Sequence, residues 1–62
     1  MIEVTRLNDK EMVINCELIE SIEANPDTTI TMTTGRKLIV KESVEDIVQF
    51  AINYKREINK SF

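Results

Sequence analysis

The sequence predicts an α+β fold: a small antiparallel β-sheet, or a curled roll, of four to five strands followed by one C-terminal α-helix. Three observations lead to this prediction. Residues 28–33 alternate threonine with isoleucine or methionine, and this period of two is typical of a strand. Turn residues bound this run, with Asn-Pro-Asp at 25–27 before it and Gly35 after it. From residue 44 onward, apolar residues recur at the spacing of one helix face.

A hairpin is expected at the N-terminus. Residues 2–7 and 11–15 both show the alternating pattern of a strand. Between them, Asn8 and Asp9 are turn residues that tolerate positive φ. The two segments are therefore predicted to pair as antiparallel strands.

The alternation fails after Cys16, because a single strand would place Leu18 and Ile19 on opposite faces. We favour a short helical turn capped by Asn15, followed by a strand that begins near Ile19. Further along, Gly35 is expected in the left-handed region, at the turn between two strands.

The C-terminal helix is predicted to begin at Ser43, whose side chain caps it, with Asp46 three residues later. Its apolar face is expected to contain Val44, Ile47, Val48, Ala51, Ile52, Tyr54 and Ile58. Lys55 falls within this face, so its ammonium group has to reach past apolar neighbours to water. Phe50 lies at the edge of the face and is interpreted as peripheral core, with contact to a partner as the alternative.

The chain is predicted to form a single domain over residues 1–62. Its strands are expected at residues 2–7, 11–15, 19–24, 28–33 and 36–41, and its helix at residues 43–59.

The hydrophobic core of a 62-residue chain contributes little stability, roughly 3–5 kcal/mol. The lone cysteine cannot form an internal disulfide. Leu7, Val13 and Ile39 are out of phase with the other alternating apolar residues of their predicted strands, and so they point to the opposite face. Both faces of the sheet therefore carry apolar residues. Because one helix covers only one face, we expect a homo-oligomer or a bound partner.

The charge distribution argues against nucleic-acid binding. The net charge is −3, and residues 1–50 carry ten acidic side chains against five basic ones. Residues 51–62 carry three basic side chains and one acidic one, which suits the C-terminal end of a helix. No segment approaches the about 20 apolar residues that span a bilayer. A single cysteine suits a reducing cytoplasm.

The sequence contains little that could carry out catalysis, so no enzymatic activity, cofactor or metal site is predicted. It has no histidine, the commonest general base, and one glycine, too few for a phosphate-binding loop. Cys16 lies beside Glu17, whose negative charge disfavours the thiolate. Two clusters of acidic residues have structural interpretations. The first, Glu17, Glu20 and Glu23, is interpreted as a solvated face. The second, Glu42, Glu45 and Asp46, is interpreted as helix capping.

Turn and capping residues between positions 25 and 43 account for most of that stretch, but a few polar residues in it have no evident structural role. These residues and two apolar ones at edges form the predicted partner-binding set: Asp27, Arg36, Lys37, Ile39, Lys41 and Phe50.

Nearly the whole chain resembles the FlbD/SwrD family of small bacterial flagellar proteins. The matching segments are I-x-V-T-R-L-N at 2–8, E-L-I-E-x-I-E at 17–23, P-D-T at 26–28, T-G-R-K at 34–37 and V-K-E-S at 40–43. One departure is Asp9, where glycine is the commoner choice after the L-N pair.

The resemblance implies a non-enzymatic, cytoplasmic accessory protein of flagellar motility, located at the flagellar base. Its expected partner is a component of the flagellar motor or stator, and its expected role is to support motor output.

The alternative is a small RNA-binding post-transcriptional regulator. The M-x-x-x-T-R opening and the order of strands then helix are similar to those of the carbon-storage regulator family. Arg6, Arg36 and Lys37 would then form a basic strip, although the acidic balance and the lack of aromatic residues on the strands argue against RNA.

Overall fold

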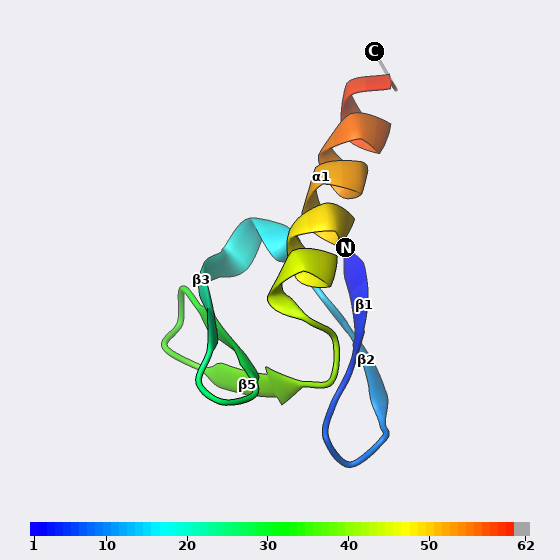
Figure 1. The fold of residues 1–62 in the computed structure, drawn as a ribbon. Helices are drawn as coiled ribbons and strands as arrows, with labels where there is room; N and C mark the ends of the chain where they lie inside the picture. Colours follow the sequence, from blue (N-terminus) through cyan, green and yellow to red (C-terminus); the bar gives the residue numbers. More distant parts are fainter. Residues whose placement is uncertain (61–62) are drawn as a thin grey trace.

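A computed structural model describes the backbone of residues 1–60 and the side chains of residues 1–57. The elements follow the predicted order: β1 (Ile2–Thr5), β2 (Glu11–Ile14), the 3₁₀ turn η1 (Cys16–Leu18), β3 (Ile19–Ala24), β4 (Thr28–Met32), β5 (Lys37–Val40) and α1 (Val44–Lys60) (Figure 1). The predicted α+β class is confirmed. Most predicted strands run one or two residues beyond the observed ends.

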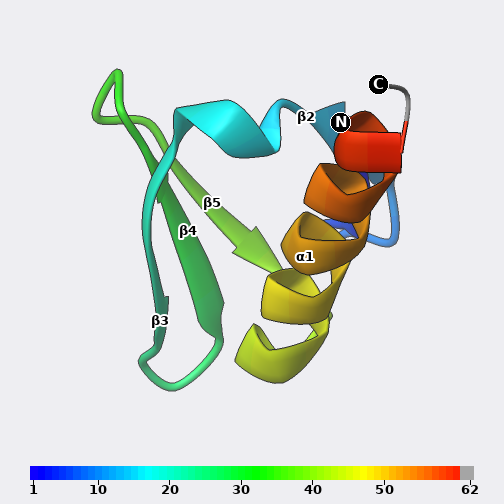
Figure 2. The same ribbon diagram turned by 90° about the horizontal axis from the view of Figure 1, so that it is seen from above.

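The strands form two antiparallel sheets, a β1–β2 hairpin and a three-stranded sheet in the order β3–β4–β5. One isolated bridge, between Arg6 and Val40, joins β1 to β5. The contact stays this short because the chain leaves β5 after Val40 and begins α1 at Val44. Figure 1 shows the two sheets on either side of the first turns of α1. Figure 2 shows η1 leading from β2 across to β3.

Two of the three hairpin turns, β1–β2 and β4–β5, contain a residue in the left-handed region. Asp9 has φ 68°, and its N–H donates to the carbonyl of Arg6 at 2.9 Å. Gly35 has φ 90°, and its N–H donates to the carbonyl of Met32 at 2.9 Å. A Cβ at Gly35 would meet nothing within 4 Å, so the backbone conformation alone favours glycine. The prediction for Gly35 is confirmed.

The predicted helical turn after Asn15 is also confirmed. The Asn15 side chain accepts a hydrogen bond from the Glu17 N–H at 3.0 Å, and its carbonyl accepts one from Leu18 at 3.0 Å. β3 then begins at Ile19, and its pairing with β4 shifts register between Ile19 and Ser21. The broken alternation in the sequence therefore marks a real change of local structure.

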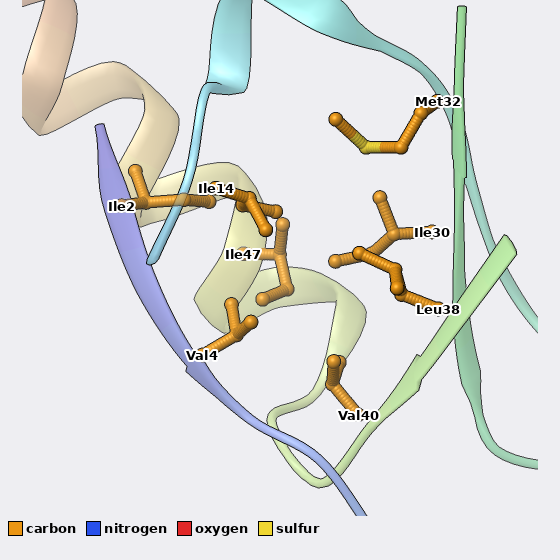
Figure 3. Packing of buried hydrophobic residues seen from close by; sticks show 8 residues of the cluster. All are labelled: Ile2, Val4, Ile14, Ile30, Met32, Leu38, Val40 and Ile47. Atoms are coloured by element: carbon orange, nitrogen blue, oxygen red, sulfur yellow. The ribbon is translucent and has the colours of Figure 1, made fainter. Parts of the chain in front are cut away.

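The core lies where α1 meets the two sheets. Among the described side chains, the buried apolar ones are Ile2, Val4, Ile14, Ile30, Met32, Leu38, Val40 and Ile47. Ile47 is fully buried and lies between side chains of the hairpin and side chains of β4 and β5 (Figure 3). Burying one such side chain contributes about 1.5–3 kcal/mol, which is a large share of the stability of a chain this short.

The buried face of α1 is narrower than predicted. Val48 and Ile52 are 44% and 41% exposed, although both were expected in the core. Ile47 and Tyr54 form the middle of the buried stripe, and Val48 and Ile52 lie about 100° and 140° around the helix from Ile47. The helix fits between two small sheets, which cover a stripe and not a broad face. Ile58 was also predicted on this face, but its side chain lies outside the part of the chain whose side chains the structure describes.

The start and edges of α1 agree with the sequence. The Ser43 hydroxyl accepts a hydrogen bond from the Asp46 N–H at 3.1 Å, which confirms the predicted cap. Phe50 is partly buried and packs against the core, as its position at the edge of the face predicted. Lys55 is exposed, so its ammonium group reaches water.

Candidate interaction surface

The end of β1 is fastened to the segment that connects β5 to α1. The Thr5 carbonyl accepts a hydrogen bond from the Lys41 N–H at 2.8 Å. The Thr5 N–H donates to both carboxylate oxygens of Glu42, at 2.8 and 3.0 Å. The Glu42 carboxylate thus takes the place of a strand carbonyl where β5 has already ended. This corrects the interpretation of Glu42 as part of the helix cap.

The environment of Glu42 favours its charged form. Burial by itself raises the pKa of Glu42. The hydrogen bonds that the carboxylate accepts, chiefly from the Thr5 backbone, outweigh burial and leave the pKa below its ordinary value of 4.5. Glu42 is therefore ionised, and its bond to Thr5 intact, at neutral pH.

Lys41 holds the opposite side of the same junction. Its ammonium group forms an ion pair with Asp9, in the turn between β1 and β2. Both side chains are exposed, so the pair contributes at most about 1 kcal/mol. No sequence pattern indicated a structural role for Lys41, and the ion pair supplies one.

These contacts produce a groove between the β1–β2 turn and β5. The antiparallel bridge between Arg6 and Val40 places Leu7 opposite Ile39 on the next step of the ladder. The groove has a volume of about 330 Å³ and is lined by Arg6, Leu7, Asn8, Lys37, Leu38 and Ile39. We call it the basic groove. In Figure 1 both of its walls, the β1–β2 turn and β5, lie away from the C-terminal end of α1.

The basic groove combines exposed apolar side chains with positive charge. Leu7 is 47% exposed and Ile39 is 45% exposed. The side chains of Arg6 and Lys37 are exposed beside them, and no acidic side chain from the described part of the chain, residues 1–57, lines the groove. A surface of this kind favours a partner segment that carries both apolar and acidic side chains.

The structure divides the predicted partner-binding residues among several places. Lys37 and Ile39 line the basic groove, and Arg36 is exposed directly before them. Asp27 is exposed in the turn before β4, where its carbonyl accepts a hydrogen bond from the Asn25 N–H at 3.0 Å. Lys41 serves the junction described above. Only two of the six residues therefore meet in one groove.

Phe50 belongs to a second groove, which lies between β1 and α1. This groove has a volume of about 420 Å³ and is lined by Met1, Ile2, Glu3, Phe50, Asn53, Tyr54 and Glu57. We call it the acidic groove.

Four lining residues of the basic groove were absent from the predicted set: Asn8, Leu38, Arg6 and Leu7. Of these, Arg6 and Leu7 carry the charge and the exposed apolar surface on the side of β1. The sequence carried a signal for Leu7, because its parity is opposite to that of Ile2 and Val4. It carried none for the bridge to Val40 that brings both residues to β5.

Other reactive or ligating groups do not gather in the described part of the chain. Cys16 is a free thiol, partly buried against the core. Residues 1–57 contain no cluster of three or more His, Cys, Asp or Glu side chains placed to hold a metal ion. Within residues 1–60, no helix has the length and apolar character required for a membrane span.

Comparison with known protein families gives a match over nearly the whole chain. The family model FlbD, described as flagellar and swarming motility proteins, matches residues 1–59. The chain belongs to the FlbD family. Membership of this family implies that this FlbD protein has a role in flagellar or swarming motility. Neither the curated proteins nor the solved structures contain a match to the chain.

The structure also accounts for the one departure of this FlbD chain from the motif on which the resemblance was based. Asp9 stands where glycine is the commoner choice, and its φ of 68° is a conformation that glycine adopts without steric cost. Aspartate tolerates this region better than most residues, and here its carboxylate also pairs with Lys41.

Proposed function

We propose that this FlbD protein is a non-enzymatic accessory protein of flagellar motility, a small interaction module that supports the output of the motor or stator. In this proposal the basic groove binds a cytoplasmic segment of a motor or stator component at the flagellar base. The observation that carries the proposal is the pairing of Leu7 with Ile39 beside two cationic side chains on a surface that α1 does not cover.

The chemistry of the chain supports binding more than catalysis. It has no histidine, and its cysteine is partly buried with no imidazole to activate it. By contrast, Leu7 in the turn after β1 and Ile39 on β5 are both nearly half exposed, an arrangement that gains free energy when a partner covers it. The cations at the rim would select an acidic segment and exclude a basic one.

The test replaces the chromosomal gene with the variants Lys37→Glu and Ile39→Ser and measures swimming, swarming and motor torque. Lys37→Glu reverses a charge at the rim and Ile39→Ser removes the apolar anchor, so both should reduce motility toward that of a deletion strain. Lys55→Glu is the matched control, because Lys55 is exposed on α1 and lines neither groove. Immunoblots check that all variants accumulate equally.

Two results would contradict the proposal. Normal motility and normal motor torque in the deletion strain would exclude a flagellar role for the protein. An equal loss of motility in Lys55→Glu and Lys37→Glu would exclude the basic groove as the binding site, since the change in net charge alone would then account for the effect.

RNA binding is the second candidate, and the observation that favours it is the meeting of Arg6 and Lys37 in one groove, with Arg36 next to it. Against it stand the net charge of −3 and the lack of any aromatic side chain among the described residues that line the groove. Gel shifts with a flagellar leader RNA at low salt decide between the two. A shift that weakens steeply with salt would support RNA binding, and no shift would remove it.

A further inference from the structure

The acidic groove is a second concave surface, separate from the basic groove. Its floor is apolar: Ile2 is buried, and Phe50 and Tyr54 are partly buried against the core. Met1, which is 63% exposed, forms one wall. The volume of about 420 Å³ lies within the range of known ligand sites, about 300–1,000 Å³.

The charge of this groove is opposite to that of the basic groove. Glu3 and Glu57 line it, and among the side chains of residues 1–57 no lysine or arginine does. A third carboxylate, that of Glu11 on β2, lies close enough to interact with Glu3. The pKa of Glu3 is raised because its protonated form donates a hydrogen bond to Glu11 and because the two charged carboxylates repel each other. Cationic groups placed here would relieve that repulsion.

The edge of β1 offers backbone groups at the same place. The Thr5 N–H and carbonyl both point toward β5 and its connection, because they bond with Glu42 and Lys41. In an antiparallel strand alternate residues point their backbone groups to the same side, so those of Glu3 also point away from β2. Within residues 1–60, no strand pairs with β1 on that side at Glu3.

We propose that the acidic groove binds an extended peptide segment of a partner protein in which apolar side chains alternate with lysine or arginine. The apolar side chain packs on Phe50 and Tyr54, and the cations pair with the carboxylates of Glu3 and Glu57. The peptide backbone bonds to the free edge of β1, in the manner of an added strand. This site is independent of the basic groove, so one molecule can hold two segments of opposite charge.

The chain carries its own reporter for this site. Tyr54 lines the acidic groove, it is the only tyrosine, and the sequence has no tryptophan. Titration of the purified full-length protein with the blocked peptide Lys-Leu-Lys-Leu-Lys should give a saturable change in tyrosine emission. The blocked peptide Glu-Leu-Glu-Leu-Glu should give none. Raising the salt concentration should weaken the cationic complex.

Variants locate the binding. Glu57→Lys should weaken binding of the cationic peptide by about tenfold or more, since it reverses a charge at the rim. Glu23→Lys makes the same change in net charge on β3, away from the groove, and should leave binding within about twofold of the wild type. Asn53→Phe fills the groove from an exposed helix position and should abolish binding. Circular dichroism checks that each variant is folded.

The proposal is overturned by any of three results at low salt. The first is no change in tyrosine emission up to about 1 mM cationic peptide. The second is equal weakening by Glu57→Lys and Glu23→Lys. The third is a change in Tyr54 emission on dilution of the protein alone, because a second copy would then occupy the groove. None of these results bears on the motility phenotype of Lys37→Glu, so this proposal and the proposed function can fail separately.

Discussion

At the scale of single residues, Glu42 shows how one side chain can complete a strand pairing that the backbone leaves unfinished. Its two carboxylate oxygens share the single N–H of Thr5 in a bifurcated hydrogen bond of 2.8 and 3.0 Å, at the position where the next residue of β5 would otherwise pair. Hydrogen bonds to a charged acceptor are stronger than neutral ones. The junction of the two sheets therefore depends on the ionisation of one residue.

We expect Glu42→Gln to lower the free energy of unfolding by about 1 kcal/mol at pH 7, since the amide accepts a weaker, neutral hydrogen bond. Because the folded pKa of Glu42 is lowered, its contribution is fully present above the ordinary value of 4.5 and is lost as the pH falls through the folded pKa. The difference between wild type and variant should accordingly shrink below about pH 4.5.

Urea denaturation at a series of pH values measures this difference. Glu23→Gln, an exposed carboxylate on β3, is the control and should show almost no change. A difference between wild type and Glu42→Gln that stays constant down to pH 2 would contradict the assigned role of the carboxylate.

At the scale of elements, α1 is held at its start by a cap and along its length by a narrow stripe. Ser43 satisfies the N–H of Asp46, and the acidic side chains of Glu45 and Asp46 lie in the first turn, where they complement the helix dipole. The stripe through Ile47 packs against both sheets. A helix buried on so narrow a face depends more than usual on its cap.

Ser43→Ala should therefore destabilise the protein by about 1 kcal/mol, the usual cost of losing a serine cap. Ser43→Asp keeps an acceptor at this position and should remain close to the wild type. Both values come from denaturation followed by circular dichroism at 222 nm. If alanine and aspartate at this position gave equal stability, the cap would not contribute.

At the scale of the whole molecule, apolar residues remain on the surface after folding. Val13 is 61% exposed on the outer face of the hairpin, and Leu7 and Ile39 are nearly half exposed on the face of the basic groove. On α1, Val48 and Ile52 form a second exposed pair. A chain of 62 residues with this distribution has both a reason to associate and several surfaces on which to do so.

We propose that the protein self-associates at high concentration, through the exposed side chain of Val13 on the outer face of the hairpin. Light scattering at about 100 μM should give a mass above the 7.2 kDa of the monomer, and the melting temperature should rise with protein concentration. Val13→Lys should lower the mass toward that of the monomer, and Lys55→Glu should not. A strict monomer with a melting temperature independent of concentration would exclude self-association.

Much of the fold could be predicted from the sequence because its signals are local. The alternation at Thr28–Met32, the left-handed Gly35 and the caps at Asn15 and Ser43 each depend on a few neighbouring residues. The structure confirms all four. Local geometry also indicated that Leu7 and Ile39 would face away from the core.

Two features of the candidate site required the tertiary structure. The bridge between Arg6 and Val40 joins residues far apart in sequence, and it alone brings Leu7 to Ile39. The roles of Lys41 and Glu42 likewise depend on β1, which precedes them by more than thirty residues. No short-range pattern specifies such contacts.

The sequence by itself therefore determined the order and type of the elements, the turns, the helix cap and the resemblance to the FlbD family. Only the tertiary structure decided how wide a stripe of α1 is buried, how the two sheets meet and where the two oppositely charged grooves lie. The physical reason is that propensity, capping and alternation act over a few residues. Grooves, in contrast, form where separate elements pack together, and that packing depends on the whole chain.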